Sequence, residues 1–203
     1  EFQALRPITM YGANKLYCEA MGRYYGRYYR SITRGDRRPP IDFRCLRLPG
    51  IISADTVPVG GTSDYVPEMI HASARGEACT CFVREDTCLP WMMMPECVQA
   101  ILQLADAPVL SRCVYNVASF SATAGTFAKA VREHFPDAEI TFEAHEGRQA
   151  LVDTWPADVD CLRAREDWGY TPRWTLEEAM REYIVPTVRA RYGESRSTEG
   201  NAL

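Results

Sequence analysis

A tyrosine and a lysine stand four positions apart near the start of the chain, Tyr11 and Lys15 in the segment PITMYGANK. Residues at this spacing share one face of a helix and can touch. An ammonium beside a phenol favours the phenolate, because the opposite charge stabilises the ionised oxygen. Such a pair could supply a general base near neutral pH. The pattern alone is more typical of a solvated helix surface.

The composition makes the lysine more informative. The chain has 23 basic residues, and only Lys15 and Lys129 are lysines. A lysine in an arginine-rich sequence favours a role for a compact ammonium, which the broad planar guanidinium performs less well.

Length and charge limit the classes of function. At 203 residues the chain can form one sizeable core, or one domain and a subdomain. The net charge of −4 gives no reason to expect nucleic acid or an anionic membrane as a partner. The eight cysteines lack paired zinc-ribbon spacing, so we expect no metal site and reduced, mostly buried thiols in an intracellular protein.

Helical and extended patterns alternate along the chain, which predicts an α/β protein. The segment 53–65 has no apolar period and several turn residues, so it is expected to be a loop. Helices are expected at 9–30, 66–75, 95–108, 122–135 and 173–193, and strands at 41–49, 79–85, 113–119 and 138–145.

The last helix carries its own start and stop signals. Thr175 and Glu178 have the spacing of a capping box, and Pro186 is expected to kink or end the helix. The polar segment 194–203 is expected to be a disordered tail.

Several longer motifs together resemble the extended short-chain dehydrogenase/reductase superfamily and, within it, the epimerase-like L-threonine 3-dehydrogenases. The order RLPGIIS, GGTSDY and DTWP is specific to the threonine dehydrogenases, and the resemblance runs from about 6 to 193. The segments that carry it are TMYGANKLYCEAMGRYY, DFRCLRLPGIISADTVPVGGTSDY, LPWMMMPECVQAI, VYNVASFS, DTWP and AREDWGY.

The resemblance implies a domain organisation. Residues 1–55 would be the C-terminal part of a Rossmann-like NAD-binding domain that carries Tyr-x-x-x-Lys. Residues 56–193 would hold a mixed substrate-binding subdomain together with returning Rossmann elements. No G-x-x-G-x-x-G occurs in the sequence. We therefore expect that a preceding segment is missing, and that this chain alone binds NAD poorly and does not turn over.

The resemblance also implies a reaction, the NAD-dependent oxidation of L-threonine to L-2-amino-3-oxobutanoate. Tyr11 would take the proton of the C3 hydroxyl as general base, and Lys15 would hold the nicotinamide ribose. The backbone of Ile51 would hold the nicotinamide carboxamide.

Three further residues match the family's threonine site. Thr62 and Asp64 would bind polar groups of the substrate, and Trp155 would close over it. The alternative for Asp64 is a cap of the following helix, and the alternative for Trp155 is an ordinary core position.

The resemblance further implies a homodimer through the helix of Tyr11 and Lys15, and an intracellular location, which is the mitochondrial matrix if the source is eukaryotic and otherwise the cytoplasm. Two other functions stay open, a sugar-nucleotide epimerase or dehydratase and a non-catalytic dimerisation module. We expect solvated or core roles for His71, His134 and His145, and core packing for the methionines of PWMMMPE.

Overall fold

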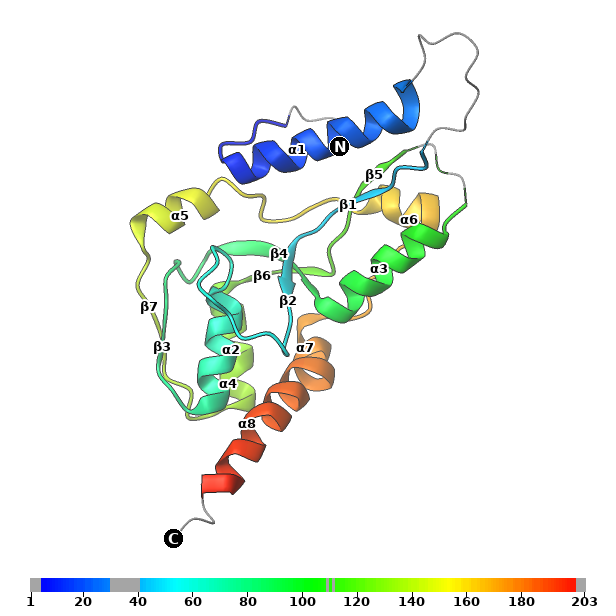
Figure 1. Cartoon of the computed structure of the whole chain (residues 1–203). Helices are drawn as coiled ribbons and strands as arrows, with labels where there is room; N and C mark the ends of the chain where they lie inside the picture. Colours follow the sequence, from blue (N-terminus) through cyan, green and yellow to red (C-terminus); the bar gives the residue numbers. More distant parts are fainter. Residues whose placement is uncertain (1–4, 30–40, 109, 111, 200–203) are drawn as a thin grey trace.

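A computed structural model describes residues 5–29, 41–108, 110 and 112–199. The chain is α/β, as expected, with helices packed around three small sheets (Figure 1). The segments 30–40 and 200–203 lie outside the described residues.

Two of the three sheets are parallel pairs and the third is mixed. Strand β1 (Cys45–Arg47) pairs with β5 (Val114–Asn116), and β3 (Cys79–Cys81) pairs with β7 (Ile140–Phe142). In the mixed sheet β4 is central, with a parallel neighbour on one side and an antiparallel neighbour on the other. Its strands are β2 (Gly50–Ile52), β4 (Cys88–Met93) and β6 (Phe120–Thr123).

The expected helices are present. The first is an α-helix that ends in a π-helical turn, η1, and the last begins at the predicted capping box. The helical elements are α1 (Met10–Arg23), η1 (Tyr24–Tyr28), α2 (Tyr65–Arg75), α3 (Met94–Asp106), α4 (Ala124–His134), α5 (Glu146–Val152), α6 (Leu162–Trp168), α7 (Leu176–Ala179), η2 (Met180–Ile184) and α8 (Val185–Glu199).

Pro186 does not end the last helix. A π-helical turn, η2, lies directly before it, where Val185 donates its N–H to the carbonyl of Met180 five residues back. The wider turn allows the helix to continue as α8 past a residue that has no N–H to donate. Residues 194–199, for which we expected disorder, continue α8.

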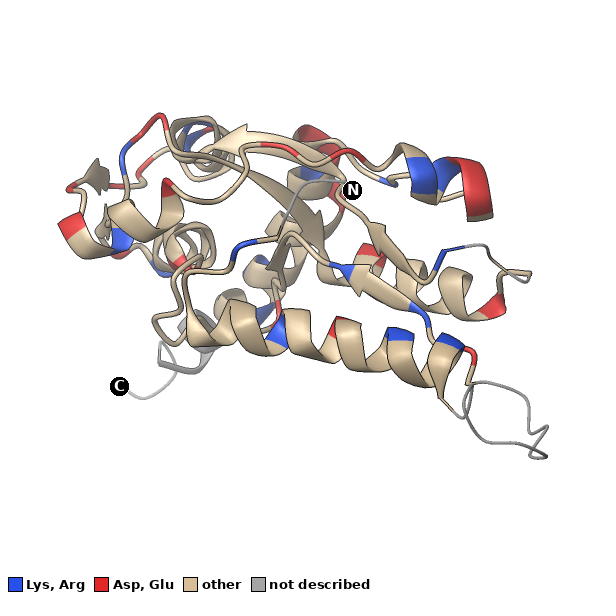
Figure 2. Ribbon diagram, turned by 90° about the horizontal axis from the view of Figure 1, so that it is seen from above, with Lys and Arg blue, Asp and Glu red and all other residues tan. Residues whose placement is uncertain are grey.

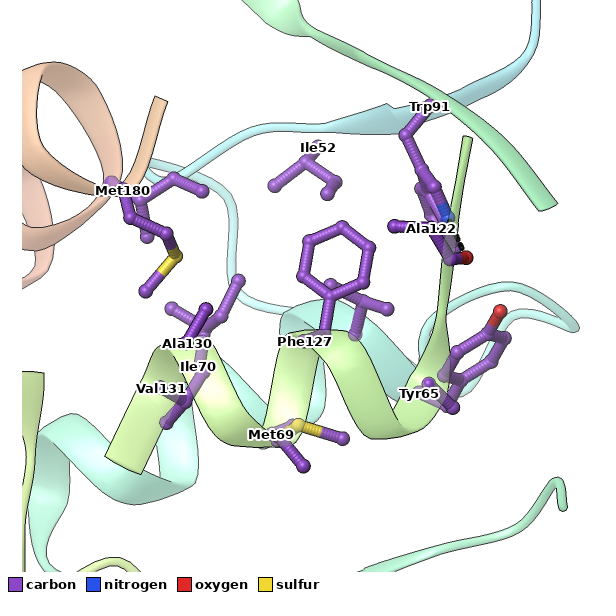
Figure 3. Packing of buried hydrophobic residues seen from close by; sticks show 14 of the residues in the cluster. Ile52, Tyr65, Met69, Ile70, Trp91, Ala122, Phe127, Ala130, Val131 and Met180 are labelled. Carbon is purple, nitrogen blue, oxygen red and sulfur yellow. Dashed lines mark hydrogen bonds between the residues drawn. The ribbon is translucent and has the colours of Figure 1, made fainter. Parts of the chain in front are cut away.

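Strand β4 separates two hydrophobic cores. Trp91 and Met93 point into the larger core, and Met92 between them points into the smaller core, as the alternation of a strand requires. In the larger core the Trp91 ring packs edge-on against Tyr65 and Phe127, with centroids 5.6 and 5.3 Å away (Figure 3). Burial on both faces explains why this strand is apolar throughout.

Helix α1 lies across one end of the molecule beside β1 (Figure 1). Glu19 is its only buried residue among those described. The Glu19 carboxylate accepts two hydrogen bonds from Arg47, at 2.7 and 2.8 Å, and one from Arg23 at 3.2 Å. Next to this ion pair the Phe43 ring rests on the backbone of Gly22, where no side chain would fit.

The C-terminal helices hold the loop that follows β2. The Tyr183 hydroxyl accepts from the N–H of Ala54 at 3.1 Å, and Arg191 donates to the carbonyl of Asp55 at 3.0 Å. His71 of α2 is fully buried beneath this loop, and its Nδ1 lies 2.8 Å from the Tyr192 hydroxyl of α8. Among the three histidines, His71 therefore has the expected core role.

Substitution of Gly22 tests the attachment of α1. We expect Gly22→Ala to lower the free energy of unfolding by about 1–3 kcal/mol, because the new methyl group overlaps the Phe43 ring. Gly193→Ala in α8 is the matched control, since a methyl group there meets nothing within 4 Å. The control should gain up to about 1 kcal/mol in helix propensity. Equal effects in chemical denaturation would contradict the docking described for α1.

The buried His71 predicts a pH dependence of stability. Burial lowers the pKa of its imidazole, and the cations Arg75 and Arg191 lower it further. The folded chain then favours the neutral ring, while the unfolded chain binds a proton near the ordinary pKa of about 6.5. We expect the free energy of unfolding to be largest above this value and to fall as the pH drops through it toward the lower folded pKa.

Denaturant titrations between pH 7.5 and 5 measure this slope. His71→Gln should flatten it, although the variant is less stable at every pH. His134→Gln, at the end of α4, should keep the slope. If the pH dependence of the free energy of unfolding persists in His71→Gln, it arises from a group other than His71.

Candidate active site

Tyr11 and Lys15 lie on the face of helix α1 that also docks the helix to the rest of the chain. Tyr11, Lys15, Glu19 and Gly22 follow one another at intervals of four, four and three residues, so they lie on one face of the helix. Glu19 and Gly22 show which way this face points, because they contact Arg47 of β1 and Phe43. The pair therefore stands on the extension of the docked face of α1.

The local geometry of the pair is that of a helix start. Thr9 caps α1, and its hydroxyl accepts from the N–H of Gly12 at 3.0 Å. The Lys15 ammonium lies 5.1 Å from the centroid of the Tyr11 ring, within cation–π range. Both side chains are exposed, Tyr11 by 73%. The predicted pair is thus in contact and accessible to a ligand.

Ile51 is the middle residue of β2 and pairs with Met92 of β4. Among the described strands β2 lies at the edge of its sheet, so half of its backbone groups face away from β4. An edge of this kind can donate and accept hydrogen bonds to a ligand amide. The position suits the role implied for Ile51.

The carboxylate of Asp64 closes the loop that contains it. Asp64 occupies the N-cap position of α2, but its side chain makes no capping hydrogen bond. Its Oδ2 instead accepts from the N–H groups of Gly61 at 2.7 Å and Val59 at 3.2 Å. The predicted alternative of a helix cap is therefore wrong in its contacts, and acceptor sites remain on the carboxylate for a further donor. Thr62 lies half-buried in the same loop.

Trp155 follows α5 and stays outside both cores. The residue is 37% exposed. Its backbone N–H donates to the carbonyl of Val152 at 2.9 Å, which closes a tight turn. The alternative of an ordinary core tryptophan is wrong in this structure. Helix α5 also reaches the Asp64 loop, because Arg148 approaches the carbonyl of Gly60 at 3.5 Å. Helix α5 thus connects the two segments predicted to bind substrate.

The sequence analysis assigned no role to four polar residues near these segments. Glu19 and Arg47 anchor the helix of the predicted pair, while Gln149 and Asp153 anchor the turn of Trp155. Glu19 could have been found, because it continues the four-residue spacing of Tyr11 and Lys15. The contacts of Arg47, Gln149 and Asp153 join segments far apart in sequence, which no local pattern encodes.

Other features lie apart from the predicted site. A pocket of about 460 Å³ is lined by the ends of α2 and α4 and by α8, and it contains none of the predicted site residues. Within the part of the chain that the structure describes, no group of three or more His, Cys, Asp or Glu could hold a metal ion. No helix in the same part is both long and apolar enough to cross a membrane.

Known proteins similar to this chain were found by sequence and by structure. The mitochondrial L-threonine 3-dehydrogenase of Bos taurus is 37% identical over 198 residues, which cover 97% of this chain and 49% of that protein. An uncharacterised epimerase/dehydratase of Staphylococcus saprophyticus is 30% identical over 189 residues, covering 92% of this chain and 56% of the other. No family model matches the chain.

Among solved structures, the apo form of a GalE-like L-threonine dehydrogenase from Cupriavidus necator superposes with a TM-score of 0.79 at 37% identity. The match covers 90% of this chain and 63% of that one. The chain therefore spans about half the length of the two curated relatives, 49% and 56%, and has the Rossmann-like α/β fold of the dehydrogenase. The resemblance seen in the sequence is confirmed: over nearly all of its length this chain is homologous to the L-threonine 3-dehydrogenases.

Proposed function

We propose that this chain contributes the catalytic pair and the substrate-binding segments of an NAD-dependent L-threonine 3-dehydrogenase. The observation that carries the proposal is the placement of Tyr11 and Lys15 in contact on the docked face of α1, in a chain homologous to these enzymes. The reaction converts L-threonine and NAD to L-2-amino-3-oxobutanoate, NADH and a proton.

Tyr11 is the general base of this reaction. Its phenolate oxygen takes the proton of the substrate C3 hydroxyl, and the Lys15 ammonium beside it stabilises the phenolate. When bound, NAD supplies the hydride acceptor. The exposure of both side chains leaves room for substrate and cofactor to meet them.

The residues present fit the nicotinamide end of the cofactor. Lys15 would hold the ribose hydroxyls, and the backbone at Ile51, on the edge strand β2, would hold the carboxamide. The sequence has no G-x-x-G-x-x-G to seat the pyrophosphate at a helix N-terminus. We therefore infer that the chain alone binds NAD weakly.

The substrate would lie between the loop of Asp64 and the turn of Trp155. The Asp64 carboxylate, already fixed by two backbone N–H groups, can accept from the substrate ammonium, and the Thr62 hydroxyl can bond to its other polar groups. Trp155 would cover the site as an apolar lid. In domain terms, 1–55 would carry the cofactor-facing pair and 56–193 most of the substrate site.

A second copy of the chain would cover the outer face of α1. Tyr17, Met21, Tyr24 and Tyr28 follow a spacing of four, three and four residues and are 40–64% exposed. The charged residues of this helix, Lys15, Glu19, Arg23 and Arg27, follow one another at intervals of four on a different face (Figure 2). An exposed apolar stripe of this kind marks an interface. We propose a homodimer, located in the mitochondrial matrix if the source is eukaryotic and otherwise in the cytoplasm.

Replacement of one stripe residue tests the dimer. Tyr17→Arg should convert a dimer to a monomer in sedimentation velocity, because the guanidinium cannot be buried unpaired. Leu162→Arg, at an exposed apolar position of α6, is the matched control and should leave the mass unchanged. A parent chain that sediments as a monomer at all accessible concentrations would exclude the interface.

L-Threonine-dependent formation of NADH tests the activity. The chain should be assayed alone and after fusion to the glycine-rich N-terminal half of a homologous L-threonine dehydrogenase. We expect little turnover from the chain alone and robust turnover from the fusion. In the fusion, Tyr11→Phe should lower kcat by roughly 10²–10⁴-fold, the range for loss of a general base.

Tyr24→Phe, on the outer face of the same helix, should leave the rate near that of the parent. Conversion of UDP-glucose in place of L-threonine would identify the fusion as a sugar-nucleotide epimerase. Full activity of Tyr11→Phe would remove the tyrosine from the mechanism.

A further inference from the structure

Gln149 is a buried polar residue with every side-chain contact in use. Its side chain is only 5% exposed. Its Oε1 accepts from the backbone N–H of Arg84 at 2.8 Å, and its Nε2 donates to Thr87 at 3.1 Å and to Asp153 at 2.7 Å. A buried amide that bridges the 84–87 loop and the end of α5 fixes both, because losing any partner would leave a desolvated polar group.

Asp153 is the end point of this network. The Arg84 guanidinium donates to both of its oxygens, at 2.9 and 3.1 Å, beside the bond from Gln149. Hydrogen bonds from Arg84 and then Gln149 lower the pKa of the Asp153 carboxyl, so it is ionised at neutral pH. The two charged side chains are half exposed, and such a pair alone contributes little. The hydrogen bond from the buried Gln149 amide is shielded from water, and it therefore contributes more to holding Asp153 than the exposed ion pair does.

The same helix end controls Trp155. Asp153 is the C-cap of α5, and Trp155 lies two residues later. The backbone N–H of Trp155 donates to the carbonyl of Val152 and closes the turn between them. Arg148, which directly precedes Gln149 in α5, stacks on the Phe82 ring at 4.2 Å. It also approaches the carbonyl of Gly60 in the loop of Asp64. The position of α5 thus sets where Trp155 stands relative to that loop.

We propose that Gln149, acting through Asp153 and Arg84, is a positioning residue that sets where Trp155 stands at the end of α5, the helix that reaches the Asp64 loop through Arg148. The lid function of Trp155 rests on the proposed dehydrogenase activity, whereas its placement by Gln149 does not. Gln149 itself touches neither substrate nor cofactor.

Exchange of the two hydrogen-bonding groups tests the proposal. Q149E places two carboxylates face to face and should shift the Trp155 turn toward open conformations about tenfold, a change typical for loss of one buried hydrogen bond. In the double variant Q149E/D153N the amide at 153 can donate to the carboxylate at 149, and the net charge equals that of the parent chain. The exposure of Trp155 should therefore return to the parent level. D153N alone serves as a second disrupting variant if Q149E does not fold.

Acrylamide quenching of Trp155 fluorescence at pH 7 measures the shift. The emission of Trp155 is obtained by subtracting the fluorescence of the same protein carrying W155F from the fluorescence of each protein. The other tryptophans, Trp91, Trp168 and Trp174, report the rest of the fold in the W155F background and should not change. E166Q, which breaks an exposed ion pair with Arg163 on α6, is the matched control and should leave the quenching of Trp155 unchanged.

Increased quenching in Q149E and recovery in the double variant support the proposal. Unchanged quenching in Q149E, or no recovery in the double variant, overturns it. The measurement uses the chain without substrate or NAD, so a failure of the proposed dehydrogenase activity would leave its outcome unaffected.

Discussion

The ion pair between Glu19 and Arg47 is the contact on which the proposed catalytic geometry depends. Helix α1 has no other buried residue in the described chain, so the usual hydrophobic attachment of an amphipathic helix is absent here. A bidentate pair with a nine-tenths buried carboxylate replaces it. Removing Arg47 would leave the buried carboxylate with the longer hydrogen bond from Arg23, at a cost on the order of 2 kcal/mol. The ion pair thereby fixes the rotation of α1, and with it the direction of Tyr11 and Lys15.

Strand β4 extends this constraint to the other candidate residues. Its register places Met92 beside Ile51, while Trp91 and Met93 anchor the larger core with α2 and α4. Helix α2 begins directly after Asp64, so the substrate loop is fixed to a densely packed body. The candidate cofactor position on β2 and the candidate substrate loop are therefore both held by the cores on the two faces of β4, and only the catalytic pair stands on a separate, lightly anchored element.

The sequence predicted the parts of this arrangement that local patterns encode. The helices around 9–30, 66–75, 95–108 and 122–135 have apolar periods, and Thr175 with Glu178 forms the expected capping box. Strand β4 was missed, because a strand buried on both faces has no alternation to detect. Strand β6 was missed because it has only four residues and runs directly into the helix that was expected to begin at 122. The continuation past Pro186 was also missed, since the expectation took no account of the π-helical turn that precedes it. The four-residue spacing alone was enough to single out Tyr11 and Lys15 as candidate site residues. Thr62, Asp64 and Trp155 became candidates only through the motifs shared with the family.

The two groups of candidate residues are therefore held with different strength, and this has a consequence for the chemistry. Asp64 and Trp155 are tied to the larger core through α2, and through α5 and its bonds to the 84–87 loop. Tyr11 and Lys15 depend on one ion pair and on the contact of Phe43 with Gly22. General-base catalysis requires the phenolate within hydrogen-bond reach of the substrate hydroxyl, about 3 Å. Small shifts of α1 would break that contact while leaving substrate binding intact, so loosening of this helix should reduce kcat before it raises KM.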